Sequence, residues 1–488
     1  MTTAAAPSQP DPDTPGPTTA GPSSTREGSR VVIVGGGPGG YEAALVARQL
    51  GADVTIVEDK GLGGSAVLTD VVPSKTLIAT AEFMTTTESA PSLGILPSGD
   101  DDGGVEVDFH KVDQRVLELA AAQSRDIRTR LEREGVAIVD GTGRLDGPAC
   151  VVATTKHGDQ RLTADIILIA TGARPRVLEG AEPDGERILT WTQLYELTEV
   201  PEHLVVVGSG VTGAEFAGAY RALGAQVTLV SSRDRVLPNE DADAAELIEG
   251  VFRRRGMEVL SRSRAAGVSR DGDRVLVELA DGRVVEGSHC LLAVGGVPNT
   301  ENLELDGAGV RLTGSGHIAV DRVSRTTARG VYAAGDCTGV LALASVAAMQ
   351  GRIAMWHSLG DAVSPLDLAQ VSANIFTAPE IATVGIPESD ITTGKVRGAV
   401  TMLPLARNPR AKMLGISEGF VKLFSHRASG LVMGGVVVAP RASELIHPIT
   451  LAIANRLTVD QVANAFTVYP SLSGSIAEAA RVLHDKRG

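Results

Sequence analysis

An internal repeat limits the folds open to this chain more than any other feature of its sequence. Residues 31–58 align without gaps on residues 204–231, and about half of the aligned positions are identical. Each copy has the pattern of an apolar strand, a glycine-rich turn, an amphipathic helix and a second apolar strand. This order is typical of a βαβ unit. The sequence therefore predicts an α/β protein with two Rossmann-like domains.

In both copies the glycines have the spacing G-x-G-x-x-G of a dinucleotide-binding turn. They are Gly35, Gly37 and Gly40 in the first copy, and Gly208, Gly210 and Gly213 in the second. The first glycine of such a turn permits a tight bend, the second lets the backbone approach a pyrophosphate, and the third lets the helix pack on the strand. A single match is weak evidence, but here each motif follows a predicted strand and opens a predicted helix. We therefore expect two dinucleotide sites.

The residue that ends the second strand of each copy indicates which dinucleotide it prefers. Glu58 ends the first copy, and its carboxylate can accept hydrogen bonds from a ribose 2′-hydroxyl, which suits FAD. The second copy ends in Ser231 and is followed by Arg233. Loss of the carboxylate and gain of a cation favour the 2′-phosphate of NADPH. The alternative is that Arg233 belongs to a solvated loop, and NADH stays open as a substrate.

Composition and charge exclude several classes of function. The chain has 45 basic and 59 acidic residues and a net charge of −14, which argues against a nucleic-acid partner. No apolar run approaches the ~20 residues of a transmembrane helix. Residues 1–28 are rich in Pro, Ser and Thr and lack a secretory apolar stretch, so they predict a disordered tail on a cytoplasmic protein. The three cysteines fit neither a disulfide framework nor a metal site, and we expect reduced thiols and no metal.

Further motifs resemble those of the flavoprotein disulfide reductases, the family of lipoamide dehydrogenase, glutathione reductase and mercuric reductase. The matching segments are Ala170-Thr171-Gly172 after an apolar strand, Ala334-Gly335-Asp336, residues 295–299 and residues 375–385. The resemblance runs from about residue 30 to the end.

The resemblance implies FAD-binding roles and a domain order. It assigns Thr171, Gly172, Gly335 and Asp336 to FAD binding, with Asp336 on the ribityl or pyrophosphate region; a simple turn residue is the alternative for Asp336. The implied order lists an FAD-binding domain in two parts (29–174 and 300–365), an NAD(P)H-binding domain (175–299) and an α+β dimerisation domain (366–488). Members of the family are homodimers whose active sites use both subunits, so we expect a homodimer or a higher homo-oligomer.

The pattern breaks where the family carries its redox disulfide. In the segment GGSAVLTDVVPSK, Ala66 and Val71 occupy the two cysteine positions, and neither side chain can exchange with a disulfide. The family's C-terminal His-Pro-x-x-x-Glu motif is also changed, with Tyr469 in place of the histidine and Gly474 in place of the glutamate. A phenol cannot replace the histidine as a base near neutral pH. The sequence therefore predicts that the chain is not a disulfide reductase.

The residues that serve hydride transfer in relatives are retained. Lys75 ends the P-S-K segment and Glu215 follows the second glycine motif. In relatives the two residues pair beside the flavin, where the lysine stabilises developing negative charge. The alternative is an ion pair with a structural role only, because Glu42 occupies the matching position of the first repeat.

The missing disulfide leaves the far face of the flavin open to another electron acceptor. We expect Ala66, Val71 and Tyr469, the last from the partner subunit, to line a slot for a flat, partly apolar acceptor. The C-terminal segment also resembles a cysteine-less actinobacterial branch of the family that reduces quinones. The predicted activity is therefore that of an FAD-dependent NAD(P)H:quinone oxidoreductase. The alternatives are a general diaphorase or NAD(P)H oxidase, and a non-catalytic pseudo-enzyme that keeps FAD.

Overall fold

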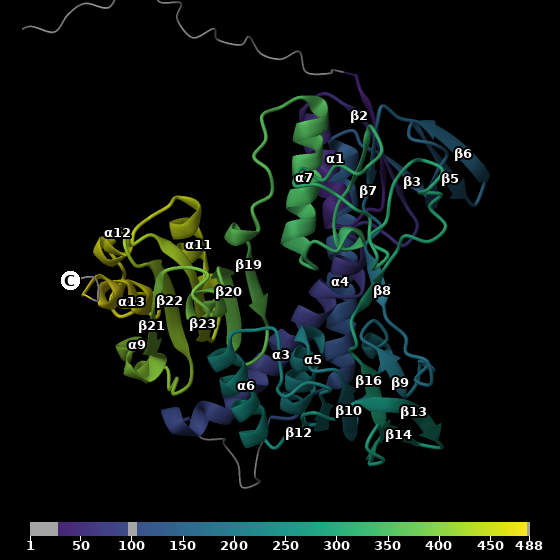
Figure 1. Cartoon of the computed structure of the whole chain (residues 1–488). Coiled ribbons are helices and arrows are strands. Elements are labelled where there is room, and N and C mark those ends of the chain that lie inside the picture. Colours follow the sequence, from purple (N-terminus) through teal and green to yellow (C-terminus); the bar gives the residue numbers. More distant parts are fainter. Residues whose placement is uncertain (1–27, 96–104, 486–488) are drawn as a thin grey trace, which may run out of the picture.

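The computed structural model describes residues 28–95 and 105–485 of the 488-residue chain, in two α/β units and a C-terminal domain (Figure 1). Residues 1–27 of the predicted tail lie outside the described residues. No helix in the described part of the chain is long and apolar enough to cross a membrane.

The first unit is built on a five-stranded parallel sheet. In spatial order its strands are β18 (Val331–Ala333), β7 (Ile166–Ile169), β1 (Arg30–Val34), β2 (Asp53–Glu58) and β3 (Ala137–Asp140). Helix α1 (Pro38–Gln49) connects β1 to β2, and α7 (Ala344–Leu359) packs along α1 (Figure 1). The central strands are runs of Val and Ile buried on both faces, as expected for parallel strands covered by helices.

The second unit repeats this topology. Its parallel sheet has the order β12 (Glu258–Leu260), β11 (Gln226–Val230), β10 (His203–Val207), β16 (His289–Leu292) and β9 (Ile188–Thr190). Helix α5 (Val211–Ala222) connects β10 to β11 as α1 connects β1 to β2, and α6 (Ala242–Arg254) precedes β12. The prediction of two Rossmann-like domains is confirmed.

The duplication extends beyond the aligned repeat. Each unit inserts a three-stranded antiparallel sheet before the strand that pairs with its first strand. These sheets are β4 (Thr142–Leu145), β5 (Cys150–Thr155) and β6 (Gly158–Thr163) in the first unit, and β13 (Ala265–Asp271), β14 (Arg274–Leu279) and β15 (Val284–Gly287) in the second.

The chain passes between the two units at one place, where β8 (Ala173–Pro175) pairs antiparallel with β17 (Gly296–Pro298). The boundaries predicted at 174/175 and 299/300 fall at or beside these two strands. Three helices follow β2: α2 (Gly64–Leu68), α3 (Val71–Ser89) and α4 (Phe109–Arg133). Helix α3 packs against both α4 and α5, so the first unit reaches into the second.

The C-terminal domain is an antiparallel sheet flanked by short helices. The strand order is β19 (Ser372–Ile375), β20 (Glu380–Gly385), β23 (Val432–Ala439), β22 (Phe420–His426) and β21 (Gly398–Pro404). The helices are α8 (Glu388–Thr392), α9 (Pro409–Met413), α10 (Ala442–Leu445), α11 (His447–Ala454), α12 (Val459–Asn464) and α13 (Gly474–Asp485). Short 3₁₀ turns η1 to η5 cover Ala90–Leu93, Leu194–Glu196, Asp336–Thr338, Leu368–Gln370 and Leu405–Arg407.

A single hydrophobic core joins the second unit to the C-terminal domain. It contains Leu77 of α3, Phe216 of α5 and Phe420 of β22, all buried. Complete burial of a side chain such as that of Phe216 stabilises the fold by about 1.5–3 kcal/mol. This shared core fixes α3 and α5 side by side, which sets the geometry of the site.

Candidate functional site

The three glycines of the first motif have the geometry that a dinucleotide turn requires. Gly35 has φ +103°, and a Cβ there would lie 2.3 Å from the backbone oxygen of Ala170. A Cβ on Gly40 would lie 2.0 Å from the Gly35 oxygen, because α1 packs directly on the turn. A Cβ on Gly37 would meet no described atom within 4 Å. The turn is therefore closed by its outer glycines and open at the middle one, where a pyrophosphate needs access to the backbone.

The second motif repeats this arrangement closely. Gly208 has φ +113°, and a Cβ there would lie 2.2 Å from the Ala293 oxygen. A Cβ on Gly213 would lie 1.8 Å from the Gly208 oxygen, whereas one on Gly210 would face open space. Helices α1 and α5 both start at the open glycine, so their N-terminal amides point to the same side as the turn. Both turns fit a bound pyrophosphate.

The acidic residue of the first repeat is held by the glycine turn. Glu58 accepts a hydrogen bond from the Gly36 amide at 2.6 Å and one from the Lys60 amide at 2.8 Å. A carboxylate has about four acceptor positions, so two remain for the hydroxyls of a ribose. Glu58 is thus fixed at the end of β2, beside the turn.

The second repeat makes the same connection with different chemistry. Ser231 and Ser209 occupy the positions that match Glu58 and Gly36, and their hydroxyls are 2.7 Å apart. Ser231 is fully buried, and its oxygen also accepts from the Arg233 amide at 3.1 Å. Ser231 therefore orders the loop from inside the protein, while the side chain of Arg233 is exposed. As nucleotide contacts, both residues stay predictions.

The Ala170-Thr171-Gly172 segment is hydrogen-bonded to Asn299, so it links the two chain segments that pass between the units. The Thr171 hydroxyl donates to the Asn299 carbonyl at 2.7 Å, and the Asn299 amide donates to the Thr171 carbonyl at 2.9 Å. The Asn299 backbone N–H donates to the Gly172 carbonyl at 3.0 Å. A Cβ on Gly172 would meet no described atom within 4 Å. The segment therefore joins the crossing points and leaves open space at Gly172.

Asp336 lies in η3 after β18, next to the buried side chain of Gln350. Gln350 accepts from the Gly335 amide at 2.8 Å and so holds the turn in place. Burial raises the pKa of Asp336, and the nearby His317 partly opposes this change. The Asp336 carboxylate has no hydrogen-bond partner within the described part of the chain. A half-buried acceptor of this kind fits the hydroxyls of an FAD ribityl chain.

Lys75 and Glu215 form the ion pair that the sequence predicts. The Lys75 Nζ lies 2.6 Å from Glu215 Oε2, and the two side chains are 26% and 4% exposed. The second oxygen of Glu215 accepts from the Phe376 amide at 2.8 Å, and the Lys75 Nζ lies 5.0 Å from the centroid of the Phe376 ring. Both oxygens of the buried Glu215 carboxylate therefore have a partner, one on α3 and one in the segment after β19. The Lys75 ammonium stays partly accessible to solvent.

The matching residue of the first repeat has a different partner. Glu42 pairs with Arg352 of α7 at 3.0 Å, on a part-exposed surface between two helices. The repeat position therefore carries a glutamate in both units, but only in α5 does its partner come from α3.

The positions that carry the family's disulfide are apolar in this chain. Ala66 lies in α2, and Val71, which is 36% exposed, begins α3. The three cysteines Cys150, Cys290 and Cys337 are free and buried. Burial raises the pKa of Cys337 to about 11, so this thiol stays protonated at neutral pH. The structure offers no cysteine pair among the described residues.

Tyr469 is not part of the site within one chain. It lies between α12 and α13 and is 82% exposed, and its neighbours Phe466 and Val468 are also exposed. In the single chain Ala66 and Val71 therefore lie at or near the N-terminal end of α3, in α2 and at the first residue of α3. Tyr469 lies on the surface of the C-terminal domain.

Sequence reasoning missed Asp70, which directly precedes Val71. Burial raises the pKa of Asp70 to about 6; Lys75 opposes this change, while Glu215 and Asp336 add to it. The sequence signal that could have indicated Asp70 is a charged residue directly before Val71, in the segment that otherwise matches the family's disulfide motif. Phe376 was missed as well, because its backbone N–H and its ring reach the ion pair only in the folded chain.

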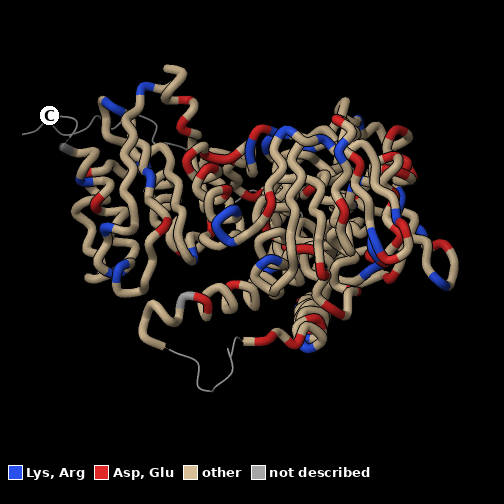
Figure 2. The backbone as a smooth tube through the Cα atoms, turned by 90° about the horizontal axis from the view of Figure 1, so that it is seen from below, with Lys and Arg blue, Asp and Glu red and all other residues tan. Residues whose placement is uncertain are grey.

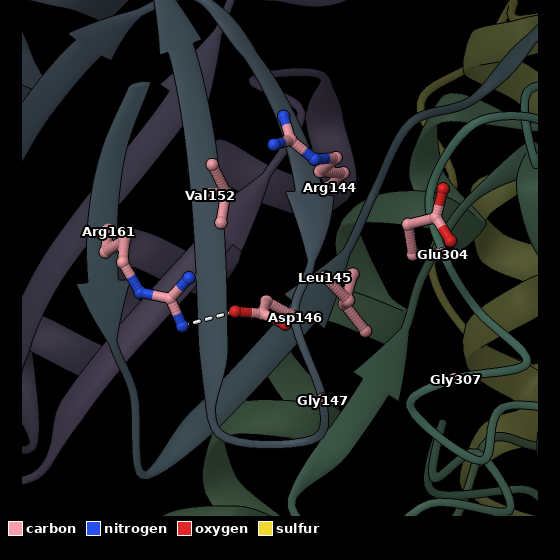
Figure 3. Close-up of a pocket in the computed structure, with 8 residues that line it drawn as sticks. All are labelled: Arg144, Leu145, Asp146, Gly147, Val152, Arg161, Glu304 and Gly307. Atoms are coloured by element: carbon pink, nitrogen blue, oxygen red, sulfur yellow. Dashed lines mark ion pairs between the residues drawn. The ribbon is translucent and has the colours of Figure 1, made fainter. Parts of the chain in front are cut away.

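One hollow borders the Lys75–Glu215 pair, and a second hollow and a charged cluster lie away from the predicted site residues. A cavity of about 160 Å³ lies between α3 and α5, and Lys75 and Glu215 are among the residues that line it. A second, of about 360 Å³, is lined by residues of the β4–β6 sheet and the 304–307 segment (Figure 3). Its arginines are paired: Arg161 with Asp146 (Figure 3) and Arg144 with Asp159. No predicted site residue lines this hollow.

The charged cluster surrounds Lys422, whose Nζ lies 2.8 Å from Asp241, 2.6 Å from Asp243 and 2.6 Å from Glu388. The three carboxylates have the spacing of metal ligands, but the ammonium lies among them and takes the place that a cation would need. Figure 2 shows acidic and basic residues interspersed over the described part of the chain.

Comparison with known proteins places this geometry in a family. The model of the pyridine nucleotide-disulphide oxidoreductases matches residues 29–351, and the model of their dimerisation domain matches residues 371–480. The chain belongs to the pyridine nucleotide-disulphide oxidoreductase family. The predicted family and fold class are thereby confirmed, and members of this family are flavin- and pyridine nucleotide-dependent oxidoreductases.

Individual relatives of this oxidoreductase cover nearly the whole chain. A protein of Mycobacterium tuberculosis named NAD(P)H dehydrogenase (quinone) is 53% identical over 474 residues, which are 94% of each chain. A dihydrolipoyl dehydrogenase of Zymomonas mobilis is 33% identical over 93% of this chain and 98% of its own. The crystal structure of LpdA from Mycobacterium tuberculosis superposes with a TM-score of 0.89 at 53% identity, over 93% of this chain and 99% of that chain.

Proposed function

We propose that this oxidoreductase transfers electrons from NAD(P)H through FAD to a quinone and has no disulfide reductase activity. The observation that carries the proposal is the contrast between two parts of one site. Lys75 and Glu215 are paired at 2.6 Å, while Ala66 and Val71 stand where a redox disulfide would be needed. The ion pair supports a role in hydride transfer, and no sulfur relay is found among the described residues.

The first glycine turn, Glu58, Gly172 and Asp336 are the residues that would hold FAD. Bound FAD would supply the two-electron carrier between the nicotinamide and the acceptor. With FAD bound, the Lys75 ammonium would stabilise negative charge that develops on the carrier, and Glu215 holds the ammonium in place. Because Glu215 is fixed by Phe376, the pair needs little reorganisation during the reaction.

The second glycine turn would bind the nicotinamide dinucleotide, with NADPH preferred over NADH. Arg233 supports this preference because its side chain is exposed just beyond β11, where the 2′ position of the adenosine ribose is expected. Ser231 contributes by fixing the Arg233 backbone rather than by offering its own hydroxyl.

The acceptor would bind against Ala66 and Val71, with Tyr469 from the partner subunit closing the slot. The match to the dimerisation domain and the exposed Phe466, Val468 and Tyr469 support a homodimer in which this segment is covered. Two small apolar side chains and a phenol suit a flat ring with polar edges, which is the chemistry of a quinone. The printed name of the Mycobacterium tuberculosis relative, at 53% identity, supports the same acceptor. We also propose a cytoplasmic location, because the three buried thiols need no oxidising compartment.

Anaerobic titration of the FAD-loaded protein with NADPH tests the proposal. We expect the flavin absorbance to bleach after one two-electron equivalent, and a panel of quinones to restore it. Uptake of four electrons would show a second redox centre and contradict the proposal. A flavin that oxygen reoxidises faster than any quinone would favour the diaphorase or oxidase, and one that excess NADPH and NADH leave unbleached would favour the pseudo-enzyme.

A further inference from the structure

The segment of residues 376–379, which joins β19 to β20, lies against the Lys75–Glu215 pair. The Phe376 amide donates to Glu215 at 2.8 Å, and the Phe376 ring lies 5.0 Å from the Lys75 ammonium. A movement of this segment would therefore alter the surroundings of both charged groups. The inference below rests on the role in hydride transfer that is proposed for the pair.

The inner side of this segment is incompletely supported by packing. Residues 376–378 line the cavity of about 160 Å³, whose other walls are formed by α3 and α5. Protein interiors are normally close-packed, and contacts between neighbouring atoms hold a segment in one place. Because the cavity removes part of these contacts, the position of the segment depends more heavily on its hydrogen bonds.

Within the described part of the chain, this segment forms hydrogen bonds to other elements at two places. The first is the bond from the Phe376 amide to Glu215. The second is made by the Ala378 carbonyl, which accepts from Arg255 Nη1 at 2.9 Å. The Thr377 hydroxyl donates to a carbonyl of the same segment, so it adds no bond to another element. Of the two partners, Arg255 is the one that lies outside the ion pair.

Arg255 is held by the same helix that carries Glu215. It directly follows α6, and its backbone carbonyl accepts from Arg221 Nε at 2.7 Å. Arg221 lies in the last turn of α5, whereas Glu215 lies in the first half of that helix. The hydrogen bonds therefore run from α5 through Arg255 and the segment back to α5. This closed path fixes the segment relative to Glu215.

The guanidinium of Arg255 is free to serve this bond. Arg255 is half-buried and forms no ion pair with a described residue. Its neighbour Arg254 is exposed and pairs with Glu418 instead. A hydrogen bond from a guanidinium is charge-assisted and stronger than one between neutral groups, so it suits a segment that packing alone does not fix.

We propose that Arg255 is a positioning residue for hydride transfer. By holding the Ala378 carbonyl, it keeps the Phe376 amide on Glu215. Glu215 in turn keeps the Lys75 ammonium in place. The role needs no contact between Arg255 and either dinucleotide. Without this bond the segment can shift toward the cavity, and the preorganised position of the ammonium is lost.

Reduction of the flavin by NADPH, followed by stopped-flow absorbance in the FAD-loaded protein, tests this role. Arg255→Met keeps most of the apolar stem but cannot donate the hydrogen bond. It should lower the limiting rate of flavin reduction by about 10- to 100-fold, because small displacements near a reacting centre have effects of this size. The dissociation constant of NADPH should change little, since no nucleotide contact is removed. Arg255→Lys, which keeps a cationic donor, should recover most of the rate.

Arg254→Met is the matched control and should reduce its flavin at the wild-type rate. FAD content and Tm, measured for every variant, show that each protein is folded and loaded. An unaltered rate of flavin reduction in Arg255→Met would contradict the proposal.

A double-mutant cycle with Lys75→Ala separates positioning from a general structural effect. If Arg255 acts through the ion pair, Arg255→Met should cause little further loss of rate once Lys75 has been replaced. A full additional loss in the double variant would contradict the proposal, because the effect would then bypass the ammonium. A wild-type flavin that neither NADPH nor NADH reduces would overturn the proposed function, and this inference with it.

Discussion

At the scale of single residues, the two repeats show how one position acquires different chemistry. Glu42 and Glu215 align, yet the first pairs with Arg352 and the second with Lys75. Glu58 and Ser231 also align, and each bonds to the second position of its own glycine turn. A carboxylate at this position keeps acceptors for a ribose, whereas a buried hydroxyl does not. The backbone geometry of the two turns is shared, and the side chains decide the specificity.

The Lys75–Glu215 pair gives the first prediction. Lys75→Ala should slow reduction of the flavin by NADPH by about 100-fold, because a preorganised charge beside the carrier is lost, while FAD stays bound. Stopped-flow absorbance measures the rate. Glu215→Gln should also slow the reaction, whereas the matched Glu42→Gln should leave the rate close to that of the wild type. Equal effects of the two glutamine variants would mean that the pair in α5 has only a structural role.

Arg233 gives the second prediction. Arg233→Ala should weaken binding of NADPH by about 1–3 kcal/mol more than binding of NADH, because a charge-assisted hydrogen bond to the 2′-phosphate is lost. Dissociation constants for both nucleotides under anaerobic conditions measure the difference, which should shrink at high salt. Similar losses of affinity for NADPH and NADH would show that Arg233 does not contact the 2′-phosphate.

At the scale of elements, Lys422 shows how the C-terminal domain is fixed to the second unit. Its buried ammonium in β22 bonds to Asp241 and Asp243 at the start of α6 and to Glu388 of α8. Burial lowers the pKa of Lys422, but the three carboxylates raise it further, so the net pKa lies above the ordinary value. The contribution to stability is therefore complete below the unfolded pKa of lysine and is lost only as the pH rises through the higher folded pKa.

Lys422→Met should destabilise the fold by about 3–5 kcal/mol, because a buried ion cluster loses its single cation and leaves carboxylates uncompensated. Chemical unfolding at neutral pH measures the loss. Asp243→Asn is the matched control: this carboxylate is half exposed, so its removal should cost much less. A small effect of Lys422→Met would mean that α6 and β22 are held by apolar packing alone.

At the scale of the whole molecule, the exposed segment between α12 and α13 predicts the assembly. Phe466 and Val468 are among the most exposed apolar side chains of the described chain. Phe466→Asp should convert a homodimer into monomers and lower quinone turnover, because Tyr469 could then no longer reach the partner's site. Light scattering coupled to size exclusion measures the mass. Val284→Asp, at an exposed valine of β15 in the second unit, should leave both mass and turnover unaltered.

The sequence alone determined the architecture, the two nucleotide turns and the loss of the disulfide. These depend on local patterns: glycine spacing, apolar strands and the residue types at fixed motif positions, all of which act over a few residues. It also pointed to Lys75 and Glu215, although their contact spans 140 positions of the chain.

Only the tertiary structure decided which groups share an environment. In sequence Asp70 stands out only as a polar residue beside Val71, and the rise in its pKa depends on burial and on charges contributed by α5 and η3. Ser231 reads as a surface contact but is enclosed, because Ser209 and the Arg233 backbone close over it. Lys422 reads as an ordinary strand lysine until three distant carboxylates converge on it. Desolvation and charge proximity belong to the packed chain, and no local pattern encodes them.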